Sequence, residues 1–207
     1  MSSGGFTLLE LLVVICIIGI LAAFLTVGVT AALNSSRFSS TEIMLNAISG
    51  ALSKYQIQWG DYPPSTIDAL GVRAPNAINN GAEALVACLS SKKKGGILYQ
   101  PPSEEHFSNV DNDKTLTNVT GWFFGDNALR EYTDFFGNVI AYLHHRDYKS
   151  AKPEVTLYRF APEGAECKIE AGKSPATKAY RNPDRFQLFS VGRDGKPGTG
   201  DDVRVGN

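Results

Sequence analysis

The chain has 207 residues, enough for one globular domain with an additional segment and too few for two enzyme-sized domains. Its 20 basic and 21 acidic residues give a formal net charge of −1, so no overall positive field attracts it to nucleic acid. Nearly all of this charge lies beyond Ser36, which separates an apolar N-terminal part from a polar remainder.

The apolar N-terminal part is long enough to cross a membrane. No Asp, Glu, Lys, Arg or His occurs from Leu11 to Ser36. About 26 residues at ~1.5 Å each give a helix of roughly 39 Å, against a hydrocarbon core of ~30 Å. A cleaved secretory signal would instead have basic residues, a shorter apolar core and a small-x-small cleavage site. A simple signal anchor is another alternative, although Glu10 then has no role and a carboxylate costs ~2.5–3.5 kcal/mol near the centre of a membrane helix.

The stretch GFTLLE, Gly5 to Glu10, followed by apolar residues, resembles the class III signal of type IV pilins and type II secretion pseudopilins. The resemblance implies that a prepilin peptidase cuts after Gly5 and methylates the new amine of Phe6. Glu10 of one subunit would then pair with the amine of its neighbour, which offsets the cost of both charges in lipid and sets the axial register. Leaders of this family usually carry Lys or Arg before the glycine, whereas residues 1–5 carry neither.

The resemblance also implies an organisation of the whole chain. Residues 1–5 are the expected leader, 6–34 the transmembrane and polymerisation helix, and 35–207 a pilin-like globular domain in the periplasm. The chain would cross the inner membrane once and then assemble into a periplasmic pseudopilus or a surface filament. The expected partners are further copies of the chain in a helical filament, the prepilin peptidase, other pseudopilins, the inner-membrane assembly platform and membrane lipid, with no nucleic acid.

Beyond the membrane segment, the sequence predicts a helix that continues and then stops. Between Ser35 and Tyr55 apolar residues recur at helical spacing, so one face of this helix is expected to pack on the globular domain. The stretch GDYPP, 60–64, ends it, because two prolines remove backbone donors. This stretch also resembles the G-x-Y-P segment of major pseudopilins. Residues 65–70 and 82–89 are predicted short helices within or near a long connection, 73–131, that we interpret as an insertion.

Three late segments have the composition of strands, and together they predict an α+β fold. Residues 138–143, 155–160 and 185–190 are β-branched or aromatic runs bounded by turns. We therefore expect a long N-terminal helix packed on a small antiparallel β-sheet, as in pilins. Thr133 to Tyr142 resembles the D-P-W-G-N-P-Y turn and strand of the major pseudopilin, but differs at both prolines and at the aromatic residue.

The C-terminal stretch SVGRDGKPGTGDDVRV, 190–205, combines four glycines and one proline with three aspartates. Such a loop is tight and irregular, and its aspartates would repel one another unless a cation or solvent lay between them. From the residues alone, a solvated turn and a Ca²⁺ site assisted by the backbone oxygens of Val191 and Thr199 are both open. The order of strand, S-x-G-x-D-G-K and paired acidic turn is similar to the calcium loop of the major pseudopilin. That resemblance implies as side-chain ligands of Ca²⁺ the residues Asp194, Asp201 and Asp202.

The remaining reactive side chains give no catalytic pattern. Cys88 and Cys167 could form one disulfide outside the cytoplasm or stay as two thiols, while Cys16 lies in the apolar segment. We expect surface positions for His106, His144 and His145, since neighbours on a strand point to opposite faces. Asp111-Asn112-Asp113 is predicted to be a turn, and Lys92 to Lys94 a solvated loop. No nucleophile, metalloprotease or phosphate-loop motif occurs, so no enzyme is expected.

These patterns predict a structural subunit of a type II secretion pseudopilus that polymerises through its N-terminal helix to support protein export. A type IV pilin or a minor pseudopilin is an alternative within the same class, and such proteins usually lack the calcium loop. A signal-anchored binding module that never polymerises is an alternative from a different class. Substitution of Glu10 would not change the function of such a module.

Overall fold

The computed structural model describes residues 5–92, 96–119, 126–160 and 164–205, with the side chains of 24–27 excepted. The first four residues of the expected leader and the lysines at 93 and 94 therefore lie outside the described residues. The chain divides into two compact units, residues 1–39 and residues 40–207. Each unit is described by itself.

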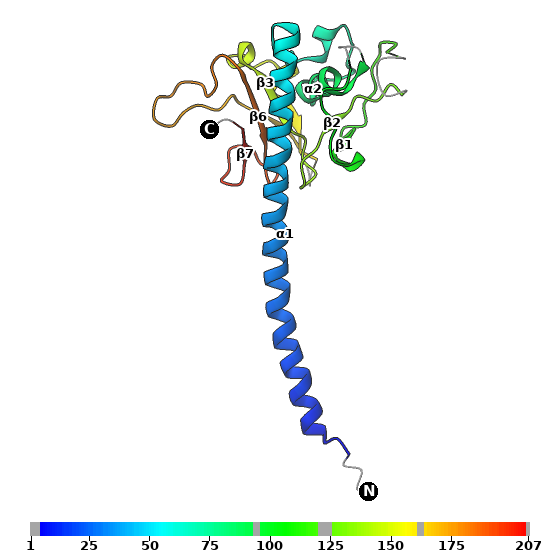
Figure 1. Ribbon diagram of the computed structural model, residues 1–207, viewed down its shortest axis with the longest axis vertical. Helices are drawn as coiled ribbons and strands as arrows, with labels where there is room; N and C mark the ends of the chain where they lie inside the picture. The colour runs from blue at the N-terminus through cyan, green and yellow to red at the C-terminus, as the bar shows by residue number, and fades with distance from the viewer. Residues whose placement is uncertain (1–4, 93–95, 120–125, 161–163, 206–207) are drawn as a thin grey trace. The chain divides into compact units, whose positions relative to one another are not determined.

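The helix α1, Leu8–Trp59, is 52 residues long and contributes to both units (Figure 1). In the first unit the large apolar side chains that the structure describes are exposed, from Phe6 before the helix to Leu33. By length and composition this helix could span a membrane, and none of its most apolar stretch is buried within the chain. Uncovered apolar surface of this extent needs lipid or other protein around it.

In the second unit α1 buries one face, which confirms the predicted continuation of the helix. Leu45, Ile48 and Leu52 are completely buried, whereas Ile43 is 70% exposed and Ile57 is 82% exposed. The buried positions recur at three- and four-residue spacing, as a helix packed on one side requires. The helix ends where the sequence predicted, because the next residue, a glycine, adopts φ +81° and two prolines follow.

A three-stranded antiparallel sheet packs beside this part of α1 (Figure 1). Its order is β3 (Ala141–His144), β6 (Phe186–Ser190), β7 (Val203–Arg204). Tyr142 pairs with Leu188, and both belong to the core shared with α1. Ala141 pairs with Phe189, and both belong to a second core on the opposite face of the sheet. The period-2 alternation of strands thus divides the second unit into two apolar layers.

The other elements surround this sheet. The helix α2, Asn80–Ser90, is buried at every position, and Leu85 and Leu89 join the core of α1. The remaining elements are η1 (Ile67–Leu70), η3 (Glu104–His106), β1 (Phe107–Ser108), β2 (Glu131–Tyr132), η4 (His145–Asp147), α3 (Pro153–Thr156), β4 (Leu157–Arg159) and β5 (Glu166–Lys168). The strand β1 pairs with β2, and β4 pairs with β5. The described part of the predicted insertion, 73–131, therefore includes a core helix.

The expectation of a pilin-like α+β arrangement is confirmed, but the sheet is built from other strands than predicted. The predicted strand 155–160 is helical at its start, since its first two residues are the last two of α3. Pro153 at the first helical position favours this turn, because its φ angle is already close to the helical value. The following strand, β4, pairs with β5 instead of joining β3 and β6. The third strand of the main sheet is β7, from the C-terminal loop.

The three cysteines are not joined by disulfides in the structure. Cys88 lies in the core between α1 and α2, where it is hydrogen-bonded with Tyr55. Cys167 lies in β5 and packs against the other core layer. Of the two alternatives that the sequence left open, the structure therefore shows separate thiols and not the Cys88–Cys167 disulfide.

The burial of α1 predicts different effects for two neighbouring substitutions. Leu45→Ala removes a completely buried side chain, so we expect the second unit to lose ~2–5 kcal/mol of unfolding free energy. The exposed Ile43→Ala is the control, with an expected change within ~0.5 kcal/mol. Urea unfolding of the full chain in detergent, followed by near-UV circular dichroism, measures both. Equal losses would contradict the packing described.

Candidate functional site

The start of α1 is a reciprocal cap between Thr7 and Glu10. The Thr7 backbone N–H and hydroxyl both donate to Oε2 of Glu10, at 2.9 and 2.8 Å. In return, the Glu10 backbone N–H donates to the Thr7 hydroxyl at 3.2 Å. This capping box satisfies donors that the first helical turn leaves without intrahelical partners. This role of Glu10 was not predicted, although the T-x-x-E spacing before an apolar run is its signal in the sequence.

The cap leaves both expected functions of this segment geometrically accessible. Gly5 and Phe6 precede the helix, and Phe6 is 80% exposed, so cleavage between them requires no unwinding of α1. Both bonds from Thr7 end on Oε2 of Glu10, so Oε1 is not engaged by them. A carboxylate held in this way can accept a further donor, such as an amine from a neighbouring chain.

The turn at 134–138 ties the main sheet to the C-terminal loop. Oδ1 of Asp134 accepts the backbone N–H of Asn138 at 2.9 Å, and its other oxygen accepts the Ser190 hydroxyl. The Asn138 side-chain amide donates to the Gly192 carbonyl at 2.6 Å. The residues that resemble the D-x-x-G-N turn of major pseudopilins thus fix the point where the C-terminal loop leaves β6.

Within that loop, the expected calcium ligand Asp201 is hydrogen-bonded by the chain itself. Its Oδ2 accepts the backbone N–H groups of Arg193 at 2.7 Å and Asp194 at 3.0 Å. Its Oδ1 accepts the Thr199 hydroxyl at 2.6 Å. A Cβ at Gly192, where φ is +67°, would lie 2.2 Å from the Asp201 carbonyl oxygen, so only glycine fits this close approach.

The other expected ligands are also engaged or buried. Asp202 forms a 2.6 Å ion pair with Arg204 through Oδ2, whereas its Oδ1 is buried without a hydrogen-bond partner. Asp194 accepts the Lys196 backbone N–H at 2.8 Å. Val191 is completely buried. In this conformation a cation at the predicted ligands would have to compete with Arg204 and with backbone donors.

Two other groups of side chains in the described ranges bring potential metal ligands together, with one ligand atom from each residue within 4.8 Å of the others. They are Asp61, His144 and His145, and Glu83, Asp111 and Asp113. The second group is unexpected. Asn112 has φ +59°, which fits the predicted turn, but Glu83 reaches its two aspartates from α2. A single carboxylate within the otherwise small and apolar run of 80–90 was the signal for it.

Two of the three histidines are buried, contrary to expectation: His106 is 5% exposed and His144 is 3% exposed, whereas His145 is partly exposed. The strand β3 ends at His144 and η4 begins at His145, so the two rings stack with centroids 4.4 Å apart instead of pointing to opposite faces. His144 accepts the Arg146 backbone N–H at Nδ1, and its Nε2 lies 3.1 Å from Asp61. Asp61 also pairs with the Arg146 guanidinium at 2.7 Å. Because His144 is bonded at both nitrogens and a cation is already present, this group is better suited to structure than to metal binding.

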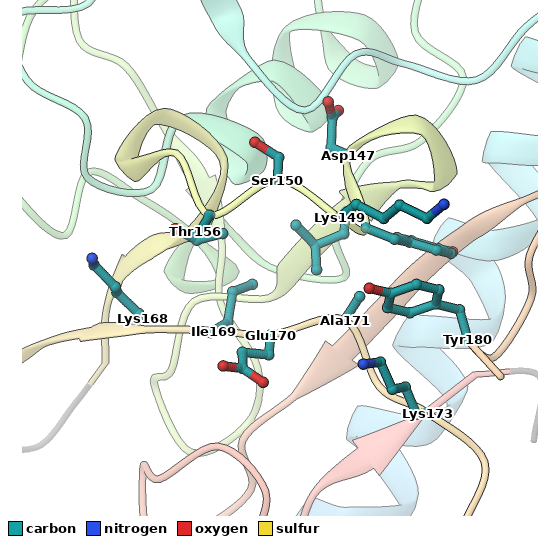
Figure 2. A pocket seen from close by; sticks show the side chains of 13 residues that line it. Asp147, Lys149, Ser150, Thr156, Lys168, Ile169, Glu170, Ala171, Lys173 and Tyr180 are labelled. Carbon is teal, nitrogen blue, oxygen red and sulfur yellow. The ribbon is translucent and has the colours of Figure 1, made fainter. Parts of the chain in front are cut away.

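A surface groove of about 240 Å³ is lined mainly by the residues that follow η4 and by those that follow β5 (Figure 2). Its labelled lysines, Lys149, Lys168 and Lys173, direct their amino groups to different sides. The Lys173 amino group lies 4.9 Å from the centroid of the Tyr180 ring. None of the described lining residues is a histidine or a cysteine.

Residues 1–26 match the prokaryotic N-terminal methylation motif. The motif supports a type IV pilin-like class of protein, processed by a prepilin peptidase and assembled in a pilus-like manner. Together with the apolar part of α1, it fits a membrane-anchored, single-pass protein. Searches of curated proteins and of solved structures gave no match.

The buried His144 predicts a loss of stability in mild acid. Burial lowers its pKa, His145 and Arg146 lower it further, and Asp61 offsets part of the shift. The unfolded chain therefore binds this proton more readily, and stability that is full above the unfolded pKa of about 6.5 is lost as the pH falls through it.

The matched variant is His144→Gln, which keeps an N–H donor for Asp61 but cannot titrate. Between about pH 7.5 and about pH 5.5 the wild-type chain should lose more unfolding free energy than the variant. Other titrating groups are common to both chains and cancel in the comparison. Parallel pH profiles of urea unfolding would contradict this role of His144.

Proposed function

We propose that the chain is a structural subunit of a type II secretion pseudopilus and polymerises through α1 to support export across the outer membrane. The observation that carries the proposal is the placement of Glu10, a carboxylate that caps the start of α1, where the described apolar side chains of the first unit are exposed. In a membrane anchor alone this charge would serve only the cap, whereas in a subunit it can also pair with an amine that the neighbour brings. The proposal gives the chain a structural role and no catalytic one.

Cleavage after Gly5 would create the matching positive charge. The amine of Phe6 would then lie one residue before the cap of α1, close to the level of Glu10 along the helix. In lipid each charge is costly alone, and breaking a buried pair by removing one partner costs ~3–5 kcal/mol. The pairing of neighbouring chains would therefore favour one axial offset between their helices.

Two features of the second unit support the major pseudopilin within this class. The turn at Asp134 and Asn138 resembles that of the major pseudopilin, and it is hydrogen-bonded to the loop that leaves β6. The loop itself contributes β7 to the main sheet, so its conformation is part of the fold. A type IV pilin or minor pseudopilin would share α1 without requiring this arrangement.

Substitution of Glu10 tests the polymerisation proposal. We expect Glu10→Gln to reduce filament yield more than about tenfold, because the amine of the neighbouring chain loses its counter-charge. Electron microscopy and sedimentation of filaments from cells that carry the secretion apparatus measure the yield. Mass spectrometry should still find methylated Phe6, and membrane extraction should be unchanged.

Glu42→Gln is the control, since Glu42 is an exposed glutamate of the same helix within the second unit. It should leave filament yield unchanged. If Glu10→Gln also assembles normally, the chain is better explained as a signal-anchored binding module. Filaments recovered from the cell surface at native expression, and not from the periplasm, would favour a type IV pilin.

Calcium binding by the 190–205 loop is a further part of the proposal. For calcium to bind, Asp202 would have to give up its ion pair with Arg204, and Asp201 its hydrogen bonds from backbone N–H groups. Oδ1 of Asp202 is the oxygen most available to the ion, because it is buried without a hydrogen-bond partner. Bound ion would stabilise only the conformation that holds it.

The loop offers a local test of that binding. Arg193 is exposed and followed by Asp194, so calcium bound here should slow tryptic cleavage after Arg193. Removal of the competing cation by Arg204→Gln should strengthen the protection, whereas Asp201→Asn should weaken it. If calcium does not change the cleavage rate of the wild-type chain or of either variant, the loop holds no calcium site.

A further inference from the structure

Three carboxylates that the sequence separates meet inside the second unit. Glu83 lies in the first turn of α2, and Asp111 and Asp113 lie in the loop between β1 and β2. One oxygen of each lies within 4.8 Å of the others. Glu83 is 1% exposed, Asp113 is 6% exposed, and Asp111 is partly exposed. The group is thus closed on the side of α2 and reached by solvent on the side of Asp111.

No N–H or O–H donor of the described chain reaches the oxygens that face this group. They are both carboxylate oxygens of Glu83 and Oδ1 of each aspartate, all buried, so Glu83 and Asp113 can hydrogen-bond to each other only through a shared proton. A buried carboxylate in this condition is costly unless a proton or a cation neutralises it. The incidental burial of one acidic side chain would leave at most two such oxygens, whereas four meet in this group.

A single amide positions the two aspartates. The side-chain N–H groups of Asn76 donate to Oδ2 of Asp111 at 3.4 Å and to Oδ2 of Asp113 at 3.2 Å. The Oδ2 atoms are thereby occupied, and the two Oδ1 atoms are the ones without partners. Asn109 fixes the same loop, because its Oδ1 accepts the Asp113 backbone N–H and its Nδ2 donates to the Asp113 carbonyl. The loop therefore holds its geometry independently of Glu83.

The surrounding charge also favours a cation. Glu131 is completely buried beside the group, and its oxygens accept the Asn79 side chain and the Val110 backbone N–H, each at 3.0 Å. It adds negative charge without offering an unpartnered oxygen. Arg159 lowers the pKa of Asp111 in part, but it also pairs with Glu166 at 2.9 Å. One shared guanidinium does not balance four carboxylates.

Protonation equilibria agree with this picture. Burial, together with repulsion from Asp113, Glu131 and Asp111, raises the pKa of Glu83 well above its usual range. Burial and the charge of Asp111 raise the pKa of Asp113 to about 7, and burial raises that of Glu131 to about 8. A divalent ion would stabilise the ionised forms of these carboxylates, because its positive charge offsets both their burial and their mutual repulsion.

We propose that Glu83, Asp111 and Asp113 bind a divalent cation, with calcium preferred. All the donors are hard oxygens, and calcium accepts about six to eight of them at about 2.3–2.6 Å, so two ligands of one ion lie up to about 5 Å apart. Ligand atoms within 4.8 Å of one another are near enough to share one ion. Three carboxylates suit calcium, whereas magnesium is usually bound through one or two carboxylates and keeps several waters. Water or backbone oxygens complete the shell from the side of Asp111. The ion cross-links α2 to the 109–113 loop.

The test uses the full chain in detergent, stripped of metal and then titrated with calcium or magnesium. Asp201→Asn/Asp202→Asn is the background, because it removes the other candidate calcium loop. In this background calcium should raise the thermal midpoint by about 5 °C or more, and magnesium by clearly less. Adding Glu83→Gln should weaken calcium binding, measured by isothermal titration, at least about tenfold.

The stability of the metal-stripped chains shows whether Glu83 is a calcium ligand or a carboxylate that stabilises the fold by itself. Glu83→Gln removes an uncompensated buried charge, so without calcium it should be at least as stable as its background. Asp113→Asn provides a second variant and should lose the same calcium response. The proposal is overturned if calcium fails to stabilise the background chain or stabilises the Glu83→Gln chain equally. An equal response to magnesium would overturn the preference for calcium.

Discussion

The structure depends on one constraint: between residues 8 and 33 of α1, the large apolar side chains that the structure describes are not covered by the chain itself. In the second unit the same helix buries Leu45, Ile48 and Leu52 against the sheet and α2. One continuous helix therefore carries two apolar surfaces of different kinds, one satisfied within the chain and one that needs lipid or other helices. The match to the N-terminal methylation motif agrees with this division.

The second unit is organised around β6, which links the parts most relevant to function. One face of the sheet packs on α1, and the C-terminal end of β6 leads into the loop held by Asp134 and Asn138. The loop returns as β7 and pairs with the strand that it left. Because of these connections, a change in the conformation of the loop would also shift the strands of the sheet that α1 packs against.

Local patterns in the sequence predicted the elements whose cause is local. The apolar spacing of α1, the prolines that follow it, and the aromatic run of β6 were sufficient to identify them. The pairing of β4 with β5, the burial of His144 and the meeting of Glu83 with Asp113 depend on contacts between distant residues, which no local pattern encodes. Composition alone did not indicate that the loop aspartates accept backbone N–H groups in the fold, and their binding of calcium stays a prediction.

The cap at Thr7 has a consequence for the electrostatics of a processed chain. Cleavage after Gly5 would leave the Thr7 N–H and its bond to Glu10 in place, so α1 would begin at the same residue before and after cleavage. The new amine of Phe6, however, would lie at the positive end of its own helix macrodipole, which disfavours a cation there. Within one subunit the amine is thus poorly placed, and a carboxylate from another chain relieves this repulsion. Processing would convert a self-contained helix start into one that is electrostatically incomplete until a second helix lies beside it.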